Sequence, residues 1–411
     1  MRNLFTLKLM LISLLTAMSM VAKADYIEFK TKDGLCYGID TDAKYATLSK
    51  YEGAATKVVI PKSVVYKGVA YDVTSLDDNC FADCSSLISV SIPSSVTSLG
   101  IGCFMWCSSL TSITIPSSVT SLGAGCFWDC SSLTSVTIPS SVTSLKDECF
   151  NGCSSLASIT IPSSITSLED GCFYGCSSLT SITIPSSVTS IGRGCFADCS
   201  SLASIRVEAN NPVYDSRENC HAIIKTSSNT MIAGCRNTII PSSVTRLEDS
   251  CFDGCSSLTS ITIPSSVTSL GRWCFDDCSS LTSITIPSSV TSLEYSCFEG
   301  CSSLTSITIP SSVTSLGDAC FAYCSSLASI RVETNNPVYD SRESCNAIIE
   351  TKTNTMIAGC RNTIIPSSVK SLGYFCFHGC SSLTSITIPS TVTSLEGNCF
   401  IDCSSLASIR V

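Results

Sequence analysis

The sequence predicts a repeat solenoid that is mostly β, with one short parallel strand and one short helical turn in each coil. A 20-residue phrase, first complete as CFADCSSLISVSIPSSVTSL from Cys80, occurs twelve times. Its usual period is 23 residues, and a fixed period of this length is typical of solenoids, whose units bury their apolar faces against their neighbours. Twelve of the fourteen prolines directly follow an isoleucine. Because proline cannot donate to a strand ladder, it ends the equivalent strand in most copies.

One coil shows how the phrase is built. Residues 112–115 alternate polar and apolar side chains, which predicts a strand, and Pro116 follows at once. The Val and Leu of the next segment, VTSL, then turn inward on the following side of the coil. Cys126 and Cys130 are four residues apart, which suits one face of a single helical turn. Stacked coils would therefore form columns of Ile, Val, Leu, Phe and Cys about 4.8 Å apart.

Residues 1–24 have the pattern of a secretory signal peptide. A basic start precedes an apolar stretch over 9–21, and Ala22-Lys23-Ala24 is a small-x-small cleavage site. The alternative is a membrane anchor, for which the apolar run is short. We therefore expect a secreted or outer-surface protein with no membrane insertion after signal removal.

The charge excludes two classes of partner. Without the three basic residues of the signal, the chain has 21 basic and 33 acidic residues, which gives a net charge of −12. Nucleic acids and anionic membranes attract basic patches, so neither is expected to bind.

Three further segments complete the expected organisation. Residues 25–72 lack the repeat and contain a hairpin pattern, which predicts an N-terminal β cap; a separate binding domain is the alternative. The solenoid covers 73–411. Two near-identical longer coils, at about 208–238 and 333–363, span 33 residues instead of 23, and each has the pattern of a β-hairpin insertion.

The phrase LxxIxIPxxVxxLxxxCFxxC resembles the leucine-rich repeats of BspA-like surface proteins, over nearly all of 73–411. The resemblance implies a leucine-rich-repeat solenoid in a host-associated bacterium, which adheres to host matrix proteins or to other bacteria. One departure concerns Ser118, which stands where the asparagine of an ordinary leucine-rich repeat would form a ladder.

Catalytic chemistry is not evident. The two histidines have no neighbouring nucleophile, and neither a phosphate-binding loop nor HExxH occurs, so we expect no enzyme activity and no cofactor. Paired acids such as Asp147-Glu148 could bind Ca²⁺ weakly, but no ligand cage is evident, and a solvated surface is the favoured interpretation.

The 29 cysteines are mostly the twelve CFxxC pairs. Buried free thiols are the leading interpretation, because cysteine behaves as a small hydrophobe, and the spacing disfavours zinc. An exported chain can also form disulfides. The candidate pairs are Cys220 with Cys235 and Cys345 with Cys360, across the two hairpins.

Two faces compete as the binding site. The strand face is a nearly constant Ser/Thr surface, either a hydrogen-bonding surface or polar filler. The helical-turn positions differ between copies, and their aromatic side chains either form a binding stripe or cover a thin core. These candidate binding residues are Trp106, Trp128, Tyr174, Trp273, Tyr295, Tyr323 and Tyr374.

We therefore expect a non-catalytic surface protein whose ligand is an extracellular protein or a glycan. Adhesion and protein binding is the first hypothesis, carbohydrate binding through the turn aromatics is the second, and a structural rod is the third. No capping hairpin follows the last coil before Val411, so we also expect end-to-end self-association through its exposed edge.

Overall fold

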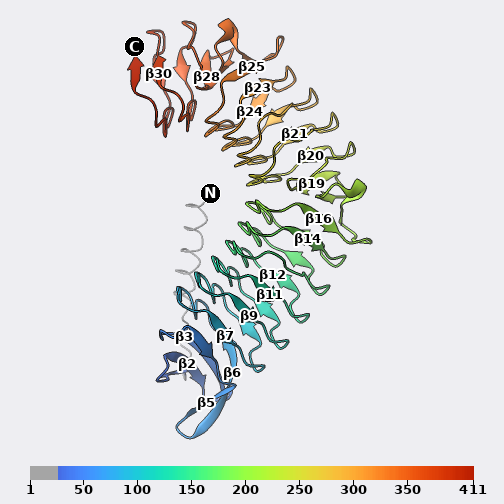
Figure 1. The fold of residues 1–411 in the computed structure, drawn as a ribbon, viewed down its shortest axis with the longest axis vertical. Coiled ribbons are helices and arrows are strands. Elements are labelled where there is room, and N and C mark those ends of the chain that lie inside the picture. The colour runs from blue at the N-terminus through green and yellow to red at the C-terminus, as the bar shows by residue number, and fades with distance from the viewer. Residues whose placement is uncertain (1–25) are drawn as a thin grey trace.

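A computed structural model describes residues 26–411 as a curved solenoid (Figure 1). Most ordinary coils contain two short strands, each paired in parallel with its equivalent in a neighbouring coil, and the others contain only the second strand. This part of the chain contains no α-helix. The predicted fold class, a mostly β repeat solenoid, is confirmed. The expected signal peptide, 1–24, lies outside the described residues.

The first series of strands consists of the Ser-Ile-Thr segments that precede proline and of their equivalents in the other coils. In the pair β9–β11, Ser112, Ile113 and Thr114 lie opposite Ser135, Val136 and Thr137. The strands are β4 (Lys57–Val59), β7 (Ser89–Ser91), β9 (Ser112–Thr114), β11 (Ser135–Thr137), β14 (Ser181–Ile184), β16 (Ser204–Val207), β23 (Ser306–Ile309), β25 (Ser329–Val332), β30 (Ser385–Thr387) and β32 (Ser408–Arg410).

The second series was not anticipated as strands. The Ser-Leu end of each VTSL segment pairs with the same two residues of the neighbouring coil, as Ser121 and Leu122 do with Ser98 and Leu99. These strands are β8 (Ser98–Leu99), β10 (Ser121–Leu122), β12 (Ser144–Leu145), β13 (Ser167–Leu168), β15 (Ser190–Ile191), β20 (Arg246–Leu247), β21 (Ser269–Leu270), β22 (Ser292–Leu293), β24 (Ser315–Leu316), β29 (Ser371–Leu372) and β31 (Ser394–Leu395).

The CFxxC segment is a pair of tight turns and not a helical turn. The residue before each first cysteine and the residue before each second cysteine have positive φ, as Gly125 (58°) and Asp129 (53°) do. A right-handed helix cannot contain such residues. The turn backbone bonds to the next coil instead, where Phe104 N donates to Cys126 O (2.8 Å).

The N-terminal region joins the solenoid earlier than its sequence suggests. The hairpin β1 (Tyr26–Lys30) and β2 (Leu35–Asp40) is antiparallel, and β2 continues antiparallel to β3 (Tyr45–Tyr51). Strand β3 is parallel to β6 (Val69–Leu76), which also pairs with β5 (Ser63–Tyr66). The Tyr51 ring packs 5.3 Å from Phe81, in the place that phenylalanine takes elsewhere. Residues 45–61 thus form a first coil, which the β1–β2 hairpin covers.

Each of the two longer coils contains an antiparallel hairpin. The first consists of β17 (Tyr214–Asp215), a 3₁₀ turn η1 (Arg217–Asn219), β18 (Ile223–Lys225) and β19 (Thr230–Ala233). The second repeats it as β26 (Tyr339–Asp340), η2 (Arg342–Ser344), β27 (Ile348–Glu350) and β28 (Thr355–Ala358). Strands β19 and β28 then pair in parallel with the next ordinary coils.

One polar cluster fixes each hairpin coil. The Arg217 guanidinium donates two hydrogen bonds to the Asp215 carboxylate and a third to Asn229 Oδ1 (2.9 Å). Arg342, Asp340 and Asn354 repeat the arrangement. Two-pronged bonding of this kind fixes geometry as well as adding energy, so the two hairpin coils share one shape.

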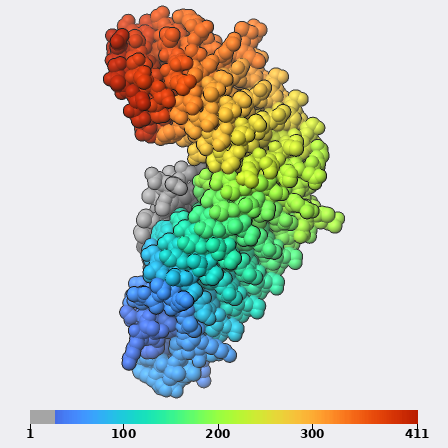
Figure 2. All heavy atoms as spheres, in the orientation of Figure 1, coloured from blue at the N-terminus to red at the C-terminus, as the bar shows by residue number. Residues whose placement is uncertain are grey.

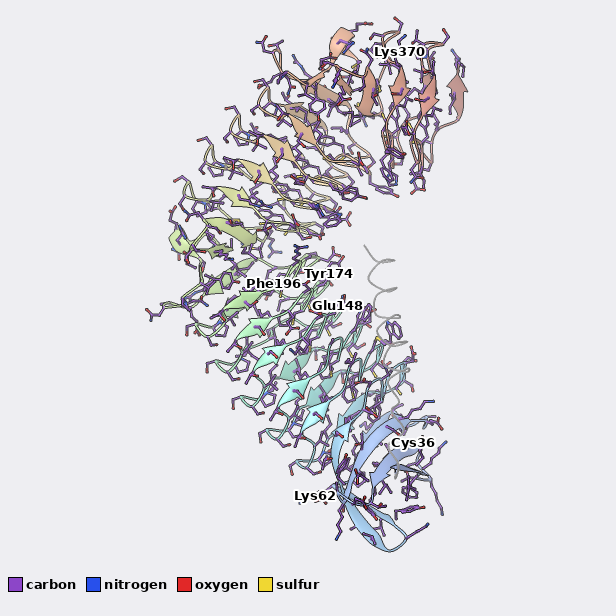
Figure 3. The ribbon with its side chains drawn as sticks, turned by 180° about the vertical axis from the view of Figure 1, so that it is seen from behind. Cys36, Lys62, Glu148, Tyr174, Phe196 and Lys370 are labelled. Carbon is purple, nitrogen blue, oxygen red and sulfur yellow. The ribbon has the colours of Figure 1, made fainter. Side chains whose placement is uncertain are left out.

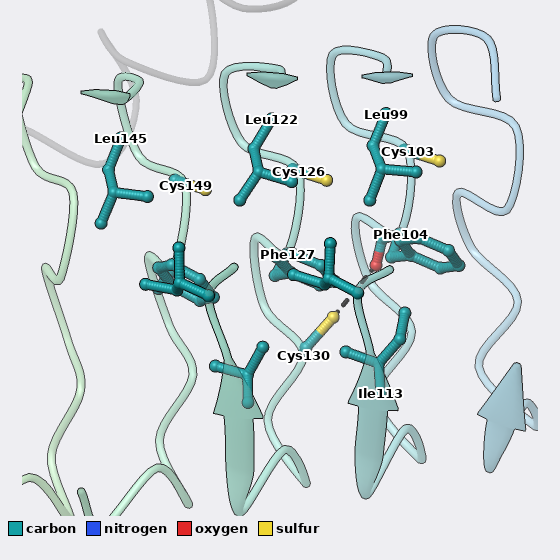
Figure 4. Close-up of a cluster of buried hydrophobic side chains, with 14 of the residues drawn as sticks. Leu99, Cys103, Phe104, Ile113, Leu122, Cys126, Phe127, Cys130, Leu145 and Cys149 are labelled. Carbon is teal, nitrogen blue, oxygen red and sulfur yellow. Dashed lines mark hydrogen bonds between the residues drawn. The ribbon is translucent and has the colours of Figure 1, made fainter. Parts of the chain in front are cut away.

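The core consists of stacked columns (Figure 4). Phenylalanine rings of successive coils lie parallel, with centroids 5.1 to 5.8 Å apart. The column is broken at each hairpin coil, where Gly234 and Gly359 replace phenylalanine. A Cβ at either glycine would lie within 2.2 Å of a ring carbon, of Phe252 and Phe377 respectively.

The hairpin coils also bend the solenoid. On the turn side, the coils before and after the first hairpin touch directly, because Asp198 N donates to Asp253 O (2.9 Å). Tyr323 N and His378 O make the same contact across the second hairpin (3.1 Å). The strands of each hairpin add thickness only on the opposite side. Each hairpin coil is therefore a wedge, and the first one projects from the outer side of the arc (Figures 1 and 2).

Candidate functional site

The twelve CFxxC turns form one continuous surface on the inner side of the arc; Figure 3 shows the turns that carry Glu148 and Tyr174 there. We define the turn face as the three residues before and the two residues after every Cys-Phe pair. Successive turns are joined by backbone bonds such as Trp106 N to Trp128 O (2.7 Å). The variable positions of all twelve coils therefore lie along one continuous surface.

The seven aromatic residues that the sequence singled out all lie on the turn face. Four of them form two pairs between adjacent coils. The rings of Trp106 and Trp128 are 6.0 Å apart and tilted by 40°, and those of Trp273 and Tyr295 are 5.7 Å apart and edge to face. Tyr174 is half-buried. Trp106 and Trp273 also have positive φ (60° and 53°), a backbone conformation that bulky residues rarely adopt.

The other two aromatics lie near the second hairpin coil. Tyr374 is 54% exposed. The Tyr323 hydroxyl donates to Asp402 Oδ2 and lies 3.0 Å from His378 Nε2. Because that hydroxyl gives its one proton to Asp402, His378 must donate from Nε2, and Nδ1 carries no proton.

His378 is held neutral by this arrangement. Its Nδ1 atom is buried and has no hydrogen-bond partner among the described residues. Burial lowers the pKa of His378, against the opposite effect of Glu299 and Asp402. Protonation would create a buried, unpaired donor, which is unfavourable.

Charge is sharply segregated onto the turn face. This surface carries 19 of the 33 acidic residues of the chain but only three basic ones, Lys146, Arg193 and Arg272. Over the rest of residues 26–411, 18 basic residues outnumber 13 acidic ones. The negative charge is thus a property of one surface and not of the whole molecule.

The acidic residues crowd most closely where the first hairpin coil is skipped. Asp198, Asp253, Asp276, Asp277 and Glu299 come from four consecutive turns; we call them the acidic seam. Asp253 is 5% exposed, and its Oδ2 atom has no hydrogen-bond partner within the described chain. Burial, and then the charge of Asp198, raises the pKa of Asp253 to about 8. Burial, and then Asp253 and Glu299, raises the pKa of Asp276 to about 9.

Away from the turn face, many hydroxyls hold coils together. In most ordinary coils the second serine after the proline donates to a carbonyl of the preceding coil, as Ser118 does to Val96 O (2.6 Å) and Ser141 to Val119 O (2.5 Å). Thr120 and Thr134 bond to the preceding coil in the same way. Serine therefore replaces the asparagine ladder of ordinary leucine-rich repeats. The strand-face residues Ser112 and Thr114 are exposed.

The cysteines are free thiols throughout, and 26 of the 29 are buried. The second cysteine of ordinary coils donates to the phenylalanine carbonyl of the preceding coil, as Cys130 Sγ does to Phe104 O (3.1 Å; Figure 4). The structure does not join the candidate disulfide pairs. Cys220 Sγ faces Ala222 O, whereas Cys235 Sγ faces His221 O, and the second pair repeats this divergence at Cys345 and Cys360.

No group of three or more His, Cys, Asp or Glu side chains within 26–411 is placed to hold a metal ion. Nor does this part of the chain contain a helix of the length and hydropathy needed to cross a membrane.

The sequence interpretation missed two parts of the site. One is the Tyr323–His378–Asp402 network, whose members are up to 79 residues apart and meet only because the turns skip the hairpin coil. The other is the acidic seam. Counting charges by their position in the repeat, rather than over the chain, would have revealed the acidic character of the turn face but not the contact between the Asp198 and Asp253 turns.

A family model described as the BspA type leucine-rich repeat region matches residues 74–203, 223–345 and 348–411, in six copies. Among solved structures, a leucine-rich cell surface protein from Faecalibacterium prausnitzii A2-165 is 28% identical, with a TM-score of 0.60 over 95% of this chain and 96% of that one. A leucine-rich repeat protein from Eubacterium ventriosum is 23% identical (TM-score 0.50; 94% and 85% covered). The pneumococcal vaccine antigen PcpA is 16% identical, with a TM-score of 0.52 over 94% of this chain and 98% of that one. Because the identities to the Eubacterium ventriosum protein and to PcpA are below 25%, these two structures show the fold alone. No curated protein matches the chain.

Proposed function

The chain belongs to the family of BspA-type leucine-rich-repeat proteins, and from this premise we propose that it is a secreted or outer-surface adhesin that binds an extracellular protein through its turn face. The ligand would be a host matrix protein or a protein on another bacterium. Catalysis has no part in this function.

The observation that carries the proposal is the contrast between the faces of one scaffold. The strand and Ser/Thr positions repeat almost unchanged, and many of their hydroxyls already bond to the neighbouring coil. The turn positions differ from coil to coil, although the backbone beneath them is the same. Two of them hold tryptophan at positive φ, where glycine would be less strained. Strain of this kind is typical of functional sites, and tryptophan is enriched at binding hot spots.

The ring geometry favours a protein ligand over a glycan. Sugar binding by stacking needs an open aromatic face. Trp106 and Trp128 are tilted against each other, and the Trp273 ring meets Tyr295 edge to face. Such pairs suit side chains that insert between rings better than a flat sugar ring. A structural rod remains the third hypothesis, and it predicts no ligand at all.

The test is a binding screen of residues 25–411 against matrix proteins, bacterial surfaces and a glycan array. For a ligand found in this screen, replacing both Trp106 and Trp128 with alanine should weaken binding by about tenfold or more. The matched control replaces Ser112 and Ser135, on the strand face of the same two coils, and should leave binding unchanged. A larger loss in the serine variant would place the site on the strand face, and binding restricted to glycans would favour the carbohydrate hypothesis.

A further inference from the structure

We propose that the acidic seam binds a lysine- and arginine-rich polypeptide segment. This deepens the proposed function, because it assigns a chemical class of partner to one stretch of the turn face. The seam comprises Asp198, Asp253, Asp276, Asp277 and Glu299, with the Trp273–Tyr295 pair in the same coils.

The first argument is the arrangement of the carboxylates. The first hairpin coil contributes no CFxxC turn, so the Asp198 turn stacks directly on the Asp253 turn. Asp277 N then donates to Glu299 O (2.9 Å), which places the next two turns in the same contact. Four turns in succession thus project acidic groups onto one strip, at one coil spacing of about 5 Å per step.

The second argument is the state of Asp253. Its carboxylate is almost fully buried, and its Oδ2 atom lacks a hydrogen-bond partner within residues 26–411. A buried carboxylate oxygen without a donor is costly, and an added ammonium or guanidinium group would supply the missing donors. The raised pKa of Asp253 and of Asp276 reflects the same crowding of acidic groups.

The third argument selects the occupant. A single metal ion is disfavoured, because no three potential ligands of the described chain converge on one point. The carboxylates are instead spread along the axis, which suits a polymer with several positive charges. An extended polypeptide places alternate side chains about 6.8 Å apart, and the long stems of lysine and arginine absorb the mismatch with the coil spacing. Trp273 and Tyr295 add aromatic faces, which attract cations.

The test uses residues 25–411 and synthetic peptides of about twelve residues, rich in lysine and arginine, with glutamate-rich peptides of equal length as probes of charge sign. Titration calorimetry should show binding of the basic peptides only, with an affinity that falls steeply as salt is added. At pH 7 the peptide should displace protons from Asp253 and Asp276, so the measured heat should depend on the ionisation enthalpy of the buffer.

Two double variants separate the seam from net charge. Replacing Asp253 and Asp276 with asparagine should weaken peptide binding about tenfold and remove the buffer dependence. Replacing Asp42 and Asp72 with asparagine also removes two carboxyl groups, which are exposed and lie outside the turn face, and should change affinity less than about twofold. Because like-charge crowding is relieved, the Asp253/Asp276 variant should also melt at a higher temperature, which distinguishes lost binding from misfolding.

Equal losses in both double variants would overturn the proposal, since binding would then follow net charge alone. Seam binding that requires added Ca²⁺ would overturn it in favour of a metal site. The outcome is independent of the adhesion test, because Trp106 and Trp128 lie in other coils. If basic peptides bind but the screen finds no ligand, this inference is upheld and the proposed function is contradicted. If the screen finds a ligand but basic peptides do not bind, the proposed function is upheld and this inference is contradicted.

Discussion

The two hairpin coils are near copies, yet the turn faces beside them have little in common. On the outer side, the Asp215–Arg217–Asn229 cluster is repeated at Asp340–Arg342–Asn354. On the inner side, the first skipped coil brings together Asp198 and Asp253, whereas the second brings together Tyr323 and His378. The comparison separates the residues that form the bend from those that line its inner surface. The hairpin residues form the wedge and are the same at both bends, whereas the turn-face residues beside them differ.

The two hairpin coils should lose the same amount of stability when their equivalent glycines are replaced. Replacing Gly234 or Gly359 with alanine forces a Cβ to within 2.2 Å of a buried phenylalanine ring. Each substitution should lower the free energy of unfolding of the surrounding coils by about 3 kcal/mol. Hydrogen exchange of the flanking coils is the measurement, because a repeat protein does not unfold as a single unit. Markedly unequal losses would mean that the two wedges are built differently.

The stability of the two turn-face regions, around Asp253 and around His378, should change with pH in opposite directions. The pKa of Asp253 is raised in the folded chain, so the folded state binds more protons, and this contribution to stability is lost as pH rises toward 8. The pKa of His378 is lowered, so the unfolded state binds more protons, and stability there is lost as pH falls below about 6.5. Acidification from pH 8 to 5.5 should therefore slow exchange in coils 251–278 and speed it in coils 376–403.

Two variants check the origin of this pH response. Asp253→Asn should reduce the response of the first region, where the raised pKa of Asp276 also contributes, and His378→Phe should remove that of the second. A response of the same sign in both regions would show that net charge, and not these two side chains, governs it.

These two regions also show how far the sequence alone could lead. The Ile-Pro strand end and the Phe and Cys columns follow from the repeat, because each copy places the same side chain at the same point of a coil. The prediction of a helical turn was wrong. The positions with positive φ hold Gly, Asn or Asp in many coils, but other coils have residues such as Trp106 and Tyr323 there, which do not indicate positive φ in the sequence. The seam could not be predicted from spacing, because it depends on Gly234 taking the place of a phenylalanine and drawing distant turns together.

The thiol columns provide a smaller test of the same comparison. In ordinary coils Cys130 Sγ lies 3.1 Å from a carbonyl oxygen, whereas beside the hairpins Cys255 and Cys380 lie 3.9 and 3.8 Å from the carbonyls of Gly234 and Gly359. Cys130→Ala should cost about 2 kcal/mol, through lost packing and a lost hydrogen bond, and Cys255→Ala about 1 kcal/mol. Cys103→Ala, in the first column, should also cost about 1 kcal/mol.

A thiol titration tests the state of these columns. Denatured, unreduced protein should give 29 free thiols, the number in the sequence. A count near five would show that the columns are cross-linked, and the stability differences between the cysteine variants would then have another cause.

The smallest expected effect is a reciprocal exchange at one backbone position. Gly194, before the first hairpin coil, and Ala319, at the equivalent place before the second, have nearly the same positive φ (57° and 58°). A Cβ on Gly194 would meet only an ordinary contact, 3.8 Å from Ala197 Cβ, so sterics with neighbours do not distinguish the two sites. The left-handed conformation costs a residue with a Cβ about 1 to 2 kcal/mol, and glycine loses part of this advantage through its greater freedom when unfolded.

Ala319→Gly should therefore stabilise the chain by about 0.5 to 1 kcal/mol, and Gly194→Ala should destabilise it by a similar amount. Ala322→Gly, in the same turn but without positive φ, is the control and should be destabilising. If Ala319→Gly also destabilised, the second turn would owe its shape to the Tyr323–His378 contact rather than to its own backbone preference, and the two turn faces would differ in scaffold as well as in side chains.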